Sequence, residues 1–277
     1  MNLHYKTRAR RLLTVTAWVV TGIAGGAPTS WSQSTSSELK VEEIVVTAQR
    51  RQESLQEVPI SVNAFSADQL ERYSISEAND LQFSTPGLGY SFAGSVYTPF
   101  IRGRGSNYAG SGLENPIAVY LDEVYLQSAY GVGGLIDVAQ VQVLNGPLGT
   151  LYGRNATGGA ILISTADPTE EFEGHLEAGG GNLGQELVQG VLNVPVNETL
   201  AVRFVAGWEN YDGHVRNVAD GSRHGGLERT QARMKVLWQP SSAFKAVPKG
   251  EYSEAERGTS IYHLVRDGSG APLDIGF

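Results

Sequence analysis

Few side chains in this 277-residue chain have the type and spacing that catalysis needs. The chain contains no cysteine, which excludes a thiolate nucleophile, a thiolate metal site and a disulfide framework. None of its five histidines stands in a His-Glu-x-x-His motif or beside a Gly-x-Ser-x-Gly turn. His214 and His224 lie near Asp212 and Asp220, but the adjoining Asp-Gly pairs are typical of a hairpin loop. We therefore expect no enzyme, no catalytic residue, no metal site and no cofactor.

Phosphate and nucleic-acid chemistry are also disfavoured. The glycine-rich connectors at 102–105, 131–134 and 146–149 match neither a P-loop nor a Gly-x-Gly-x-x-Gly turn that opens a helix. The formal net charge of -8 argues against a nucleic-acid surface.

The remaining candidate is residues 42–48, whose main-chain groups can form the hydrogen bonds of a strand. Isoleucine, valine and threonine in this segment favour an extended backbone, and charged and polar residues follow at 49–53. One interpretation is the first strand of a core. The other is a strand that adds to the edge of a partner's sheet, where main-chain hydrogen bonds provide the affinity.

The elements before this segment form an export signal. Four basic residues open the chain, residues 12–27 are uncharged, and Ser30 and Ser32 place small side chains before a cut at Gln33. This predicts a signal peptide over residues 1–32, with a membrane anchor as the alternative. Its removal leaves 21 - 4 = 17 basic and 29 acidic residues, a formal charge of -12. An exported chain without cysteine fits a Gram-negative envelope.

Residues from 59 onward alternate between short strands and helices. Ile60 to Phe65 has the period of a half-buried strand, and Ser66 with Gln69 forms a capping box that opens a helix. A second short helix is expected from Ser76 to before Pro86. Further strands are expected at 98–102, 117–121, 138–144 and 160–165.

After Pro168 the period becomes two. Apolar or small residues occupy even positions over 172–178, 188–194, 200–208 and 232–238, and polar residues stand between most of them. This is the pattern of transmembrane β-strands, with Trp208, Tyr211 and Trp238 as interfacial aromatics. A soluble antiparallel sheet with one wet face alternates in the same way and stays the alternative.

Several motifs resemble those of TonB-dependent outer-membrane receptors. They are Glu43 to Ala48 (EIVVTA), Val58 to Val62 (VPISV), Phe100 to Gly103 (FIRG), Val119 to Asp122 (VYLD), Val141 to Pro147 (VQVLNGP) and Gly149 to Ala160 (GTLYGRNATGGA). The resemblance covers about residues 42–240 and is most specific in the last motif.

The resemblance implies an α+β plug domain followed by the first antiparallel strands of an outer-membrane β-barrel. The division is then a signal peptide (1–32), a linker with the TonB box (33–53), the plug (54–168) and the start of the barrel (169–277). The implied partners are the energy-transducing protein TonB in the periplasm, outer-membrane lipid, and a small-molecule or iron-chelate ligand such as a ferric siderophore. The TonB-binding residues would be Glu42, Glu43, Ile44, Val45, Val46, Thr47 and Ala48.

Two further groups of site residues follow from the resemblance. A ligand is expected to meet an apical plug loop that carries Arg102, Arg104, Asn107 and Tyr108. Alternatively, Arg102 and Arg104 form salt bridges between plug and barrel. Contacts in the plug core or with the barrel are expected from Gly146, Pro147, Gly149, Tyr152, Gly153, Arg154, Asn155, Gly158 and Gly159.

The chain departs from the family pattern at three plug positions. Asn145 replaces an arginine that ties plug to barrel, Gln142 replaces an acidic residue, and Glu123 replaces a glycine. If that glycine position has a positive φ, Glu123 is strained there. Pro248 also interrupts an expected strand.

About five strands are expected in 171–277, whereas single-chain barrels close with an even number of eight or more. We expect a fragment of a receptor or a truncated product. The functional hypothesis is an outer-membrane receptor that imports a ferric siderophore or similar nutrient, gated by its plug. The alternative is a periplasmic plug-like module that binds TonB without transport.

Overall fold

The computed structural model describes residues 45–46, 51, 53–56, 58–93, 96–107, 114–126, 134–216 and 221–258. The chain divides into two units, residues 1–42 and 43–277, and the first lies outside the described residues together with the predicted signal peptide. Within the described ranges, no helix combines the length and apolar character needed to cross a membrane.

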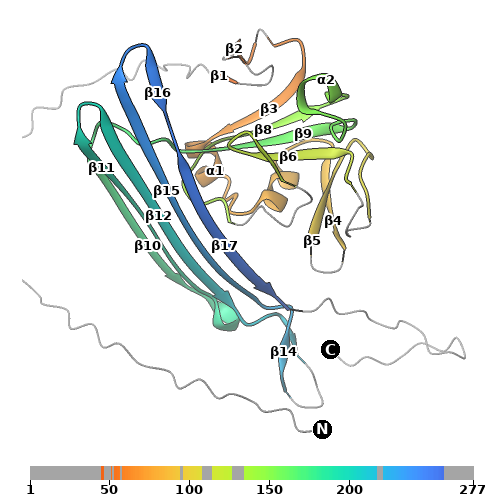
Figure 1. Ribbon diagram of the computed structural model, residues 1–277. Helices are drawn as coiled ribbons and strands as arrows, with labels where there is room; N and C mark the ends of the chain where they lie inside the picture. The colour runs from red at the N-terminus through yellow and green to blue at the C-terminus, as the bar shows by residue number, and fades with distance from the viewer. Residues whose placement is uncertain are drawn as a thin grey trace, which may run out of the picture. The chain divides into compact units, whose positions relative to one another are not determined.

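A five-stranded mixed sheet forms the centre of the predicted plug (Figure 1). Its strand order is β3-β8-β9-β6-β7, in which β6 and β9 are parallel and the other pairs antiparallel. The predicted strands are confirmed, whereas the three-residue strand β7 was missed. The strands are β3 (Ser61–Ser66), β6 (Ile117–Leu121), β7 (Val124–Leu126), β8 (Val138–Asn145) and β9 (Gly159–Thr165).

One face of this sheet packs on two short helices and a hairpin. Leu70 of α1 (Ala67–Arg72) and Leu81 of the 3-10 helix η1 (Ala78–Phe83) share a buried cluster with Val141 and Val143. The hairpin of β4 (Leu88–Ala93) and β5 (Val96–Ile101) joins the same cluster. The predicted capping box is present, since the Ser66 N–H donates to Gln69 Oε1 over 3.0 Å.

The other face is covered by three small elements. These are β1 (Val45–Val46), β2 (Glu53–Ser54), which pairs antiparallel with β1, and α2 (Gly149–Tyr152). Val46 is fully buried there, in a cluster with Leu144, Tyr152 and Leu162. Val45 and Val46 are therefore seated on the plug in this structure.

The remaining strands form a second sheet, which we call the wall. It runs β10-β11-β12-β15, and β15 also pairs with β16 and β17 (Figure 1). The 3-10 turn η3 (Asn182–Gly184) joins β10 to β11, and the hairpin of β13 (Val215–Arg216) and β14 (Arg223–His224) lies between β12 and β15. The wall strands are β10 (Glu173–Gly180), β11 (Glu186–Asn197), β12 (Leu200–Tyr211), β15 (Leu227–Ser241), β16 (Phe244–Ala246) and β17 (Lys249–Arg257).

The predicted period-two strands are confirmed by the wall. Pro248 does break the chain, but only between β16 and β17, which both pair with β15. Its carbonyl still accepts the Val236 N–H over 3.0 Å. A proline at this position removes one ladder donor without ending the sheet.

The wall buries its charged face and exposes its apolar face, which is the reverse of a soluble sheet. Arg203, Arg229 and Lys235 lie on one face and are at most 9% exposed. The other face leaves apolar side chains open, with Leu176 at 77% exposed. A soluble sheet buries its apolar face and hydrates its charges, so the wall has the arrangement of transmembrane strands. Further exposed residues on the apolar face are Val188, Leu192, Phe204, Met234, Trp238 and Tyr252.

Candidate functional site: plug–wall contacts and the seat of strand β1

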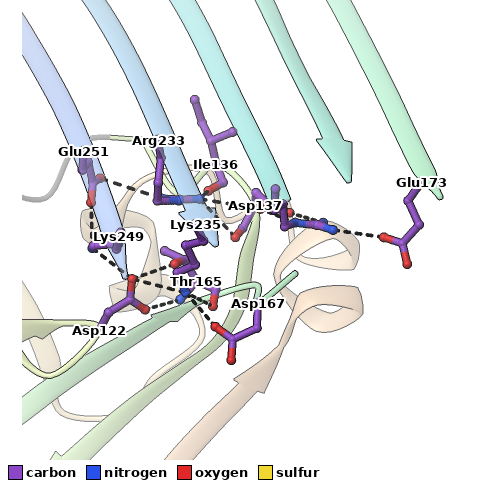
Figure 2. A network of polar contacts seen from close by, with 11 residues as sticks. Asp122, Ile136, Asp137, Thr165, Asp167, Glu173, Arg233, Lys235, Lys249 and Glu251 are labelled. Carbon is purple, nitrogen blue, oxygen red and sulfur yellow. Dashed lines mark hydrogen bonds and ion pairs between the residues drawn. The ribbon is translucent and has the colours of Figure 1, made fainter. Parts of the chain in front are cut away.

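The strongest contact between plug and wall is made by Asp137, which immediately precedes β8. Arg203 of β12 donates to it through Nε (2.8 Å) and Nη2 (2.6 Å), and the paired side chains are only 7% and 10% exposed. Arg233 of β15 lies 3.8 Å from the same carboxylate and donates to the Ile136 carbonyl over 2.6 Å. Glu173 accepts from the other side of Arg203 over 3.0 Å (Figure 2). This bidentate pair fixes both distance and orientation between the two sheets.

A second contact surrounds Asp122, which follows β6. Its carboxylate accepts the N–H and the hydroxyl of Thr165, each over 2.7 Å. Lys249 of β17 donates to it over 3.0 Å, and Lys235 of β15 lies 3.5 Å away. Lys235 also reaches the Thr165 carbonyl (2.9 Å) and Asp167 (3.0 Å) (Figure 2). We call the set Asp122, Asp137, Thr165, Asp167, Arg203, Arg233, Lys235 and Lys249 the anchor network.

The surroundings of Asp122 shift its protonation. Burial on its own raises the pKa of the Asp122 carboxyl. Hydrogen bonds from Thr165 and Lys249, with the charge of Lys235, act the other way and prevail, so the net pKa lies below its usual range. Asp122 is therefore charged near neutral pH.

Both anchoring aspartates have left-handed backbones. Asp122 has φ 46° and Asp137 has φ 54°, and Glu123 beside the first has φ 67°. Aspartate enters this region more readily than most residues. Glu123 lies in the turn between β6 and β7, and its positive φ is the condition under which strain was expected there. The conformation suits glycine better than glutamate.

A third contact lies toward the end of the wall at Tyr211, Leu227 and Arg257. Glu77, just before η1, pairs closely with Arg229 and lies 3.9 Å from Arg257. Arg229 also lies 3.2 Å from Glu209, and Arg257 stacks over the Tyr97 ring at 5.2 Å. The β4–β5 hairpin is thus tied to this end of the wall.

The structure describes part of the predicted TonB-binding segment. Val45 and Val46 form β1, whereas Glu42, Glu43, Ile44, Thr47 and Ala48 lie outside the described residues. Val45 is about half exposed, and its carbonyl accepts Gln140 Nε2 over 2.9 Å.

Two of the predicted ligand residues, Arg102 and Arg104, come shortly after β5. The Arg102 N–H donates to the Gly87 carbonyl (2.7 Å) and its Nη2 to Ser61 (3.4 Å). Arg104 packs toward Gly158. In the described part of the chain neither arginine forms an ion pair, so the expected salt bridges to the barrel are not seen there. Asn107 is exposed, and Tyr108 lies outside the described residues.

The residues of the motif at 146–159 contact other plug residues in the structure. Tyr152 is buried, and its carbonyl accepts the Tyr120 hydroxyl over 2.6 Å. Asn155 donates to the Tyr125 hydroxyl over 2.7 Å, and Arg154 forms an exposed pair with Glu114 at 2.8 Å. A Cβ at Gly159 would lie 2.5 Å from the Leu144 carbonyl oxygen, so only glycine fits. Three other features of this motif are local. Gly146, Gly153 and Gly159 have positive φ angles, and Gly149 is the first residue of α2. Leu148, which follows Pro147, is buried, and Gly158 packs against Ile117.

The departures at Asn145 and Gln142 place neutral amides in the plug sheet. Asn145 is buried and donates to Ser61 over 3.2 Å, while its Oδ1 has no partner. Gln142 is 1% exposed and donates to Gln140 Oε1 over 2.6 Å. These contacts are with other plug residues, whereas the wall is bound by the anchor network.

The histidines between β12 and β15 sit where the sequence suggested. His224 is in the β13–β14 hairpin and contacts the Ser222 hydroxyl at 3.1 Å. Among the described residues, no cluster of three His, Asp or Glu side chains is placed to hold a metal ion.

Sequence reasoning did not select the anchor network, although it noted some of its members. Arg203, Arg233 and Lys235 are among the polar residues that alternate with apolar ones in the period-two strands. Asp137 and Asp167 carried no motif. An acidic residue directly after or before a plug strand, facing unmatched basic residues on a predicted wall, was the available signal.

The comparisons with known proteins agree with this architecture. Residues 54–160 match the family model described as TonB-dependent Receptor Plug Domain. The pesticin receptor of Yersinia pestis is 29% identical over 200 residues, which cover 71% of this chain and 30% of that receptor. The vitamin B12 transporter BtuB of Vibrio vulnificus is 27% identical over 198 residues, 68% of this chain and 31% of BtuB. The crystal structure of the ferric yersiniabactin uptake receptor FyuA from Yersinia pestis superposes with a TM-score of 0.60 at 27% identity, covering 66% of this chain and 29% of FyuA.

These matches confirm the resemblance. Residues 54–160 match the TonB-dependent receptor plug domain, and the chain is similar to receptors and transporters that contain it. It spans about 30% of the length of the relatives it matches. Those relatives are receptors and transporters, in agreement with the expectation that the chain is not an enzyme.

Proposed function

We propose that the protein works as a TonB-dependent outer-membrane transporter, in which the plug closes a barrel and gates the uptake of a ferric siderophore or a similar nutrient. The observation that carries this proposal is the inverted polarity of the wall. Its charged face packs on the plug through the anchor network, and its apolar face is left for lipid.

The relatives support the transport class. They include a vitamin B12 transporter and a ferric yersiniabactin uptake receptor, of which the matched segments cover 31% and 29%. The cargo proposed for this chain is a class of ligand, a ferric siderophore or a similar nutrient. The signal peptide (1–32), linker (33–53), plug (54–168) and barrel start (169–277) are part of the proposal.

The proposed partner in the periplasm is TonB, which would capture the segment at 42–48 by strand addition. Val45 and Val46 already form a strand that pairs with β2. The same extended backbone can therefore pair with a partner once it leaves β2.

Membrane location is tested by fractionation of the full chain after export. We expect it in the outer-membrane fraction, released only by detergent. Recovery in the soluble periplasmic fraction would support the plug-like module instead, but the exposed apolar face of the wall speaks against that alternative.

TonB capture is tested by Val45→Pro, because proline removes a ladder N–H. We expect loss of cross-linking to TonB with the plug still folded. Ser37→Pro, in the serine-rich linker, is the matched control and keeps cross-linking. Undiminished cross-linking of Val45→Pro would show that TonB does not take this strand.

A further inference from the structure

Strand β1 is held on the plug by a pair of glutamines on β8. Gln142 donates through Nε2 to Gln140 Oε1 over 2.6 Å, and Gln140 donates through Nε2 to the Val45 carbonyl over 2.9 Å. Alternate residues of a strand point to one face, so these two side chains share the face of Leu144, which packs with Val46. The relay therefore lies beside the buried side chain of β1.

The order of donors and acceptors in this relay has one consistent direction. Gln142 is buried and presents an N–H to Gln140, which obliges Gln140 to turn its oxygen toward Gln142. The Gln140 amide nitrogen then points at the Val45 carbonyl. A flipped Gln140 would place two N–H groups face to face and leave the Val45 carbonyl without this donor.

We propose that Gln140 is a positioning residue that keeps β1 docked, and that Gln142 sets its direction. The pair thereby controls how often Val45 and Val46 are free for capture. This inference rests on the proposed function, in which TonB takes this strand, and it adds the element that regulates access to it.

The relay contains no ionisable group, so its two hydrogen bonds should not change with pH between about 4 and 9, since neither the amides nor the carbonyl titrates there. The anchor network, which is built from charges, differs in this respect. Glu53, opposite Val46 on β2, is a charged residue beside β1, so each variant is compared with its parent at the same pH and salt.

The test uses the full chain in detergent with Val46→Cys, which is the single thiol because the sequence has no cysteine. Position 46 is fully buried while β1 is docked, so its reaction rate with a dithiodipyridine reagent reports release. We expect Gln140→Leu to raise the rate about five- to tenfold, the effect of one hydrogen bond. Gln142→Leu should raise it less, because Gln140 keeps its donor.

Gln82→Leu is the matched control. Gln82 Oε1 accepts the Tyr90 N–H over 3.3 Å, away from β1. We expect its rate to equal that of the Val46→Cys parent. Equal rates for Gln140→Leu and Gln82→Leu would overturn the inference.

Gln140→Glu separates a positioning role from general packing. An ionised carboxylate has no donor for the Val45 carbonyl, whereas the protonated acid has one. Relative to the parent at each pH, the rate should be raised at pH 7 and return toward the parent below about pH 4.3, the ordinary pKa of glutamate. A ratio that does not change with pH would contradict the relay.

Capture of the same variants by the purified periplasmic domain of TonB keeps the two proposals apart. If both hold, Gln140→Leu raises thiol reactivity and TonB capture together. A rise in reactivity with unchanged capture would uphold the relay and refute TonB as the partner of this strand. Unchanged reactivity refutes the relay whatever TonB does.

Discussion

Strand β1 and the wall contact the same plug through different kinds of atoms. β1 is held by the apolar side chain of Val46 and by amide groups at Gln140 and Gln142. The wall is held by a buried ion pair at Asp137 and by a partly buried one at Asp122. The contact of β1 with the plug involves two short strands, whereas the contact of the wall involves several strands of each sheet.

This difference explains how the plug can release β1 and still keep its contact with the wall. A single neutral hydrogen bond contributes about 1 kcal/mol, so β1 can leave and return. Removing one partner of a buried ion pair costs about 3–5 kcal/mol, because the other charge is left buried and unpaired. A substitution in the anchor network should therefore lower stability more than one at the seat of β1. The comparison is testable by changing each region separately.

The largest effect is expected from Asp137→Asn. It removes the bidentate acceptor of Arg203 and leaves that buried guanidinium with Glu173 alone. We expect a loss of about 3 kcal/mol in the free energy of unfolding, measured by denaturant titration and by faster amide exchange over 134–145. Glu114→Gln breaks the exposed Arg154 pair and should cost below about 1 kcal/mol. Similar losses in both variants would contradict the contrast.

The next effect is pH dependence around Asp122. Its pKa is lowered in the folded protein, so its stabilisation is fully present above the unfolded value of about 3.9 and is lost as pH falls through the lower folded value. We expect the protection of amides near Thr165, their exchange rate relative to the unfolded chain at the same pH, to fall below about pH 4, and Val46→Cys reactivity relative to a free thiol to stay constant. Asp122→Asn, which tolerates the left-handed backbone, should remove the acid-dependent part. Constant protection down to about pH 2 would exclude this role of Asp122.

A smaller effect is expected from Val46→Ala. Two buried methyl groups are lost, about 1.6 kcal/mol at about 0.8 kcal/mol per group. Hydrogen exchange over residues 45–54 should accelerate about tenfold or slightly more, while exchange over 134–145 does not change. Val45→Ala, at the half-exposed neighbour, is the control and should have a weaker effect. Faster exchange at 134–145 would show that the two regions are coupled.

The smallest effect is expected from Arg102→Gln. The described contacts of Arg102 are within the plug and its side chain is exposed, so the free energy of unfolding should change by less than about 0.5 kcal/mol. Thermal unfolding in detergent measures this. A loss as large as that of Asp137→Asn would restore Arg102 as an anchor to the barrel.

The sequence predicted the strands well because both sheets have strict local patterns. The period of two in the wall and the apolar runs at 117–121, 138–144 and 160–165 specify strands without knowledge of their partners. The same pattern could not decide which face of the wall is wet. That required the plug, whose acidic residues bury the charged face.

The site was harder to predict because its partners are distant in sequence. Asp137 and Arg203 are 66 residues apart, and no local rule selects that pair among the other charges. The ligand residues were assigned to an apical loop, and that assignment stays a prediction. The β4–β5 hairpin was predicted only in its second strand, near 98–102.

The short connection between β1 and β2 has a kinetic consequence. Residues 47–52 join the two strands, so β2 is presented to β1 at an effective concentration on the order of millimolar. Any partner that takes Val45 and Val46 must compete with this tethered strand, and its apparent affinity falls in proportion to the fraction of time that β1 is docked. The apparent affinity of such a partner therefore depends on the length of the six-residue tether between β1 and β2, as well as on the sequence of β1.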